Sequence, residues 1–137
     1  MKRLAFLFIF SVWCVGIGFS QNPKVDSLRL LLPESTNEKR VEILHALVIN
    51  LWLNHPDTAL QYAREALRLS GTLNDLRLQA ISVRLVGGVY PYKGMYDSAL
   101  YYTKLAHAIS LKTNDSTLIS STYNNLGFVY YHLSSYS

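Results

Sequence analysis

The feature that most constrains this chain is an internal repeat with a period of forty residues. The segment DTALQYAREALRLSGTLND, which begins at Asp57, returns as DSALYYTKLAHAISLKTND, which begins at Asp97. The two copies agree at small and apolar positions and differ freely at charged ones. A second set of matches lies outside these segments and pairs Gly87, Val89, Tyr90 and Tyr96 with Gly127, Val129, Tyr130 and Tyr136. A repeat of this length is typical of an array of similar supersecondary units.

Apolar residues after residue 21 recur at helical spacing and almost never alternate as in a strand, so we expect an all-α fold. A short first helix should begin at Asn22 and Pro23 and place Val25, Leu28, Leu31 and Leu32 on one side. Ser35 and Glu38 match a capping box for the second helix. Further helices are expected at about 56–69, 75–89, 96–111 and 116–133, separated by turns.

Small residues at equivalent places predict where helices touch, because axes that approach closely leave no room for large side chains. Alanines seven positions apart lie on one face of a helix. An ordinary helix bundle that uses alanine for its helix propensity is the alternative, but it does not predict a forty-residue register. The residues expected in contacts between helices are Ala59, Ala66, Gly87, Tyr90, Gly94, Tyr96, Ala99, Ala106, Gly127 and Tyr130.

The pattern in the second unit resembles the tetratricopeptide repeat (TPR) signature. The matching positions are Val83, Val86, Gly87, Tyr90, Gly94, Tyr96, Ala99 and Ala106, and Tyr123, Leu126, Gly127, Tyr130 and Tyr136 repeat the first half. The first unit keeps only Ile43, Ala59 and Ala66. Thr103 stands where the family has an aromatic residue, and the period exceeds the usual length of about 34 residues.

This resemblance implies a TPR-like α-solenoid of antiparallel helix hairpins, with about two and a half repeats. We expect a leading helix and linker at 21–35 and an array over 36–137. Its repeats would cover about 36–74, 75–114 and an incomplete 115–137. The array with its leading segment resembles the exported N-terminal sensor regions of bacterial two-component histidine kinases and related regulators.

The first twenty residues have the layout of a secretory signal peptide. Lys2 and Arg3 precede an uncharged apolar run, and Gly18 and Ser20 are small residues before Gln21. This pattern predicts cleavage after residue 20 and an exported, periplasmic or extracytoplasmic protein. A retained membrane anchor is the alternative, because the run approaches the roughly 20 residues that a spanning helix needs.

Composition after residue 20 argues against several functions. The single cysteine of the chain, Cys14, lies in the leader, so disulfides, thiolate metal sites and cysteine nucleophiles are excluded from the rest. Charges are scattered singly, which does not indicate a nucleic-acid footprint. No catalytic motif occurs, so we expect no enzyme, no cofactor and no metal site. The histidines at 45, 55, 107 and 132 are too dispersed to suggest a metal cluster.

The TPR resemblance implies a concave face lined by the first helix of each repeat. The positions that carry ligand contacts would be Arg84, Gly88, Tyr92, Asn124, Phe128, Tyr131 and His132. Packing against neighbouring helices is the equally weighted alternative. Equivalent positions in the first repeat are apolar, so we expect the leading helix to cover Leu44, Val48, Leu51 and Trp52.

The expected function is therefore a non-enzymatic interaction module that binds a peptide or protein segment, as a sensory or scaffold part of a signalling protein. The alternative is a truncated sensor region of a membrane histidine kinase, whose catalytic part lies outside this chain. A third possibility is self-association through an uncapped last repeat.

Overall fold

The computed structural model describes residues 22–135, and these residues are almost entirely helical, with no strand among them. The elements are α1 (Pro23–Leu31), α2 (Asn37–Leu51), α3 (Pro56–Ser70), α4 (Leu76–Val89), the short 3-10 helix η1 (Tyr90–Lys93), α5 (Tyr96–Ser110) and α6 (Ser116–Ser135). The prediction of an all-α fold is confirmed for these described residues. The predicted signal peptide, 1–20, and Tyr136 lie outside the described residues.

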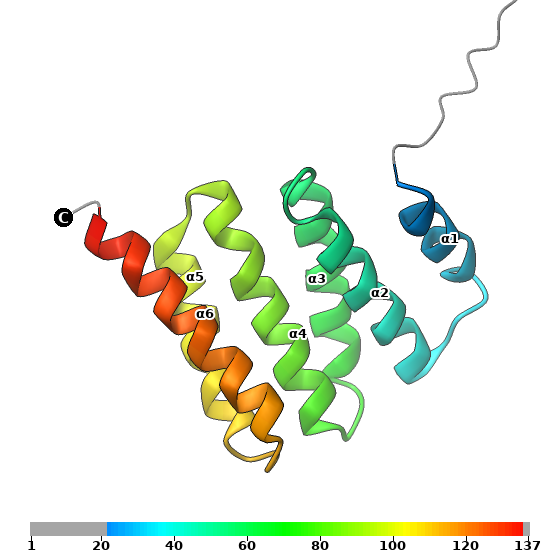
Figure 1. Cartoon of the computed structure of the whole chain (residues 1–137). Helices are drawn as coiled ribbons and strands as arrows, with labels where there is room; N and C mark the ends of the chain where they lie inside the picture. Colours follow the sequence, from blue (N-terminus) through cyan, green and yellow to red (C-terminus); the bar gives the residue numbers. More distant parts are fainter. Residues whose placement is uncertain (1–21, 136–137) are drawn as a thin grey trace, which may run out of the picture.

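Consecutive helices pack against one another, and the hairpins α2–α3 and α4–α5 lie side by side (Figure 1). Contacts also join α2 to α4 and α4 to α6, so these three helices form a row with α3 and α5 behind it. The helix α1 packs on α2 at one end of the row, and α6 lies at the other end.

The start of the array differs from the sequence prediction at one cap. Asn22 caps α1 as expected, since its side-chain oxygen accepts a hydrogen bond from the Val25 amide. The capping box is wrong, because α2 begins at Asn37 after Thr36, which makes no side-chain cap. Ser35 instead donates a hydrogen bond to the Leu32 carbonyl at 2.7 Å, so it satisfies the end of α1.

The forty-residue register reappears in the hydrogen bonds that end α3 and α5. The amides of Gly71 and Leu111, which are forty positions apart, each bond the carbonyl four residues earlier at 3.1 Å. At the next helix start, Asp75 and Asp115 each accept a bond from the amide three residues later at 2.9 Å. Equivalent backbone bonds and equivalent aspartate caps therefore build both connections, because each helix end must satisfy its free backbone groups.

The core lies between the hairpins and contains most of the predicted small residues. All four predicted alanines are completely buried, and apolar side chains of α2 and α4 fill the space beside them. Gly87 marks the closest approach of α4 and α5. A Cβ atom there would lie 2.8 Å from Thr103 Oγ1 and 3.0 Å from the Thr103 amide nitrogen. The buried alanines are Ala59, Ala66, Ala99 and Ala106.

Three of the predicted contact positions are corrected. Gly127 has open space where its Cβ would be, and Tyr130 is 48% exposed, because none of the described helices lies on that face of α6. Gly94 is also exposed and packs against nothing. Its φ of 69° shows a different role, since glycine adopts the left-handed backbone that ends η1 without strain. Tyr96 is half-buried and its ring stacks on His132.

Opposite effects are expected when the two equivalent helical glycines are replaced by alanine. Gly87→Ala should lower the free energy of unfolding by about 1–3 kcal/mol, because the new methyl group meets the backbone of Thr103, which cannot rotate away. Gly127→Ala should raise the free energy of unfolding by about 0.5–1 kcal/mol, because alanine has a higher helix propensity than glycine and its methyl group would meet no other atom. Urea denaturation of both variants measures the difference. Equal shifts of the same sign would contradict a close α4–α5 approach.

Candidate functional site

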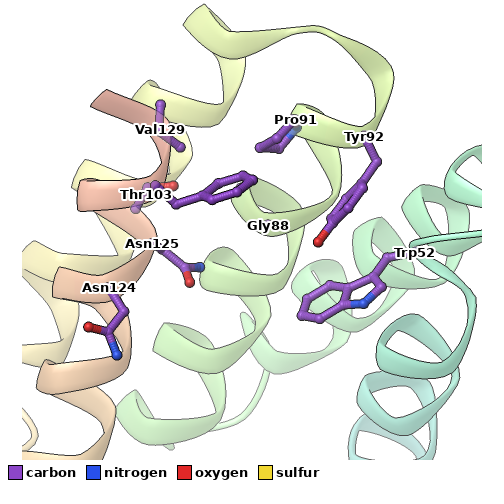
Figure 2. A pocket seen from close by; sticks show the side chains of 10 residues that line it. Trp52, Gly88, Pro91, Tyr92, Thr103, Asn124, Asn125 and Val129 are labelled. Atoms are coloured by element: carbon purple, nitrogen blue, oxygen red, sulfur yellow. The ribbon is translucent and has the colours of Figure 1, made fainter. Parts of the chain in front are cut away.

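A pocket of about 230 Å³ opens in the row of α2, α4 and α6, above α5 (Figure 2). Five segments supply its lining: the end of α2, the end of α4, η1, α5 and α6. Its volume is below the range typical of drug-sized ligands and suits one side chain or a molecule of similar size. The lining residues are Trp52, Gly87, Gly88, Pro91, Tyr92, Thr103, Asn124, Asn125, Phe128 and Val129.

One wall of the pocket is aromatic. Trp52 is the residue that ends α2, and its ring stacks on that of Tyr92 with centroids 6.0 Å apart. Tyr92 reaches this place because Pro91 lies in η1, where the chain leaves α4 and cannot continue an α-helix. Gly88 lies between the Trp52 ring and Asn125. A Cβ at this position would lie 3.3 Å from the Trp52 ring and 3.7 Å from the Asn125 amide nitrogen, so a larger residue would narrow the pocket.

The opposite side and the floor combine apolar and polar groups. Val129 of α6 is buried, and Asn124 and Asn125 of the same helix present carboxamides (Figure 2). Asn124 is exposed, so it lies at the rim. Thr103 of α5 is completely buried, and its Oγ1 has no hydrogen-bond partner among residues 22–135. The pocket therefore has a polar rim and mainly apolar walls, and Thr103 lies beneath it, packed against Gly87.

Arg84 lies one helical turn before Gly88 on α4. Its side chain is half-buried, its Nε has no hydrogen-bond partner, and no carboxylate of residues 22–135 forms an ion pair with it. Burial lowers the pKa of the Arg84 guanidinium from its usual value. A desolvated cation without a counter-ion is costly, and such groups occur where a ligand supplies the missing charge.

His45 of α2 is a buried neighbour of this cation. Burial lowers the pKa of His45 to about 4. The positive charge of Arg84 is the second cause of this shift, and the negative charge of Glu42 opposes it. The ring Nε2 lies 2.7 Å from Ser82 Oγ, and that hydroxyl donates its hydrogen to the Leu78 carbonyl. His45 Nε2 therefore carries the proton that bonds Ser82, which fits a neutral, structural histidine.

The structure brings four of the seven predicted concave-face residues to this pocket, namely Gly88, Tyr92, Asn124 and Phe128. Arg84 lies on the same helix, a turn away. Tyr131 and His132 do not line the pocket, because they lie further along α6, where His132 stacks on Tyr96.

Trp52 is the main residue that the sequence prediction misplaced. Leu44, Val48 and Leu51 are buried as expected, but Trp52 lines the pocket because it lies past the last turn of α2. The sequence analysis also did not predict Thr103 as a pocket residue. The signal for it was the threonine itself, which stands where the TPR pattern has an aromatic residue. A small residue at that position leaves space that a ring would fill.

Residues 22–135 contain neither a cluster of metal ligands nor a helix suited to a membrane. No group of three metal-ligating side chains comes together among them. None of their helices combines the length and the apolar character needed to cross a membrane.

The geometry thus defines stacked helical hairpins over residues 22–135, with a mixed apolar and polar pocket in the row of α2, α4 and α6. Comparison of the chain with protein-family models, with curated proteins and with solved structures finds no match.

Proposed function

We propose that the chain is a TPR-like α-solenoid that acts as a non-enzymatic interaction module and binds a peptide or protein segment. The ligand lies across the row of α2, α4 and α6, with one of its side chains in the pocket. The signal-peptide pattern of residues 1–20 supports export of the protein, in which the module would have a sensory or scaffold role.

The observation that carries this proposal is the composition of the pocket. Aromatic and apolar walls supply the area that anchors a side chain, and Trp52 and Tyr92 belong to the residue types that dominate binding energy at interfaces. The carboxamides of Asn124 and Asn125 each offer a donor and an acceptor, which match the peptide backbone.

Arg84 adds a charge preference to the same face. Its guanidinium has no partner among the described carboxylates, so a ligand carboxylate would compensate an otherwise unpaired cation. Four residues of helix separate Arg84 from Gly88, a rise of about 6 Å. An extended peptide covers this span with about two residues. The preferred ligand therefore has an acidic group about two residues from its anchoring side chain.

A selection from random linear peptides displayed on phage tests the proposal with the purified protein. We expect enriched peptides that carry a bulky side chain about two positions from an acidic group. Arg84→Gln should weaken the binding of such a peptide roughly tenfold, because a charge-assisted hydrogen bond is lost. Isothermal titration calorimetry measures the change.

Lys112→Gln is the matched control, because Lys112 is an exposed cation in the turn between α5 and α6. It removes the same charge away from the row and should leave affinity unchanged. Selection of no peptide, or equal losses in the two variants, would contradict the proposed binding face.

A further inference from the structure

One side of α6 is exposed at the same register positions that α4 buries. Ser120, Tyr123, Gly127 and Tyr130 are spaced three, four and three residues apart, so they share one side of the helix. We name these four residues the outer face of α6. All four are exposed, and the two tyrosines are 57% and 48% exposed. Their equivalents forty positions earlier are all buried, namely Ala80, Val83, Gly87 and Tyr90.

The helix that covers these positions on α4 is α5. A Cβ at Gly87 would lie 3.0 Å from the Thr103 amide nitrogen and 3.2 Å from Tyr102 Cβ. The ring of Tyr90 stacks on that of Tyr102, with centroids 5.5 Å apart. Among residues 22–135, α6 has no helix in this place, since a Cβ at Gly127 would meet nothing within 4 Å. The outer face is therefore the α6 counterpart of a surface that packs closely on a helix in the preceding unit.

One edge of the outer face is already formed by α5. Lys104 lies 5.8 Å from the centroid of the Tyr130 ring, and the His107 ring lies 4.3 Å from that of Tyr123. In the preceding unit α3 has the corresponding place beside α4, because Arg64 stands forty residues before Lys104 and bonds the hydroxyl of Tyr90. The outer face thus continues the series of α2–α3 and α4–α5 interfaces, and the place equivalent to that of α5 is open to solvent (Figure 1).

The two hairpins show what kind of helix fits that place. The second helix of each hairpin buries four small residues spaced four, three and four positions apart, which puts them on one side. None is larger than threonine, so the two helix axes can approach closely. All eight residues are 0% exposed, namely Ala59, Ala63, Ala66 and Ser70 of α3 and Ala99, Thr103, Ala106 and Ser110 of α5.

We propose that the outer face of α6 is a docking surface for a helix of a partner protein, which carries small residues at this same spacing. The partner helix lies on α6 as α5 lies on α4. An aromatic residue directly before its second small residue stacks on Tyr130, as Tyr102 stacks on Tyr90. None of the four outer-face residues lines the pocket, so this surface is independent of the proposed peptide site.

The probe for the test is a synthetic peptide with the sequence of residues 95–112, which contains all of α5. It is titrated into the purified, isotope-labelled protein and followed by NMR. We expect it to shift the amide signals of Gly127 and Tyr130. A second peptide with leucine in place of Ala99 and Ala106 should bind at least about tenfold more weakly, because larger side chains prevent the close approach. No binding of the first peptide at millimolar concentration, or equal binding of both, would overturn the proposal.

Gly127→Ala separates docking from folding, because this substitution should stabilise the free protein. Its methyl group lies where the partner helix must approach, so the affinity for the α5 peptide should fall at least about tenfold. Gly71→Ala is the matched control. Gly71 is an exposed glycine at the end of α3 with a φ of −66°, and its replacement should leave the affinity unchanged. Equal affinities of the Gly127→Ala variant and the wild type would contradict docking at the outer face.

Sedimentation velocity distinguishes a partner helix from a second copy of this chain. We expect the protein without peptide to remain a monomer at the concentrations of the NMR titration. A concentration-dependent dimer that Gly127→Ala abolishes would assign the outer face to self-association and would overturn the proposal of a partner helix.

Discussion

Replacing Tyr90 by alanine should lower the free energy of unfolding by about 3–5 kcal/mol, as for other large aromatic residues deleted from a core. Tyr90 is only 5% exposed, and its ring stacks on that of Tyr102 with centroids 5.5 Å apart. Its hydroxyl also accepts a hydrogen bond from Arg64 at 3.1 Å. The truncation therefore removes buried apolar area between α4 and α5 and leaves a cavity. Urea denaturation measures the loss.

Tyr130→Ala is the matched control, because it is the same substitution forty residues later. Tyr130 is 48% exposed, and its ring has a cation partner, Lys104, at 5.8 Å. Lys104 itself lies forty residues after Arg64, so the two tyrosines share a register but differ in burial. Tyr130→Ala should cost less than about 1 kcal/mol. Similar losses in the two variants would show that the α6 face is covered in solution.

A fall in pH from 6.5 to 4 should remove about 3 kcal/mol of stability through His45. The pKa of this buried ring is lowered to about 4 in the folded protein, against 6.5 in the unfolded chain. Between these values the unfolded chain binds a proton that the folded protein does not, so stability falls as the pH falls through this window. The free energy of unfolding, measured by urea denaturation at several pH values, gives the slope.

His45→Gln provides the decisive comparison, because glutamine does not titrate but can still donate to Ser82. The variant should be less stable than the wild type at pH 7, and its stability should depend much less on pH between 6.5 and 4.5. His55→Gln, at an exposed position, should keep the wild-type slope. An unchanged slope in His45→Gln would assign the pH dependence to other groups.

The helices were predictable from sequence because their signals are local. Proline at the first turn of α1 and α3, apolar spacing and repeated Asp caps all act within a few residues. The prediction of a capping box failed because one side chain could satisfy either of two helix ends. The Ser35 hydroxyl bonds the last turn of α1, and the sequence pattern does not show which helix end it satisfies.

The pocket was only partly predictable because it depends on contacts between units. Gly88 and Phe128 followed from the repeat register, whereas Trp52 comes from a chain position past the end of α2. Thr103 carried a signal in its departure from the repeat pattern. Only the packing of α5 under α4 and α6 turns that departure into an unpartnered hydroxyl beside a cavity.

The helices of this chain contact mainly their neighbours along the sequence, and this locality has a consequence for evolution. Thr103 lies outside the core cluster that contains Leu47 and Ala63, so a change at Thr103 does not remove a member of that cluster. Gene duplication of a forty-residue unit can therefore supply a copy whose pocket residues change while the other copy keeps its packing. New ligand preferences can arise in such an array one unit at a time.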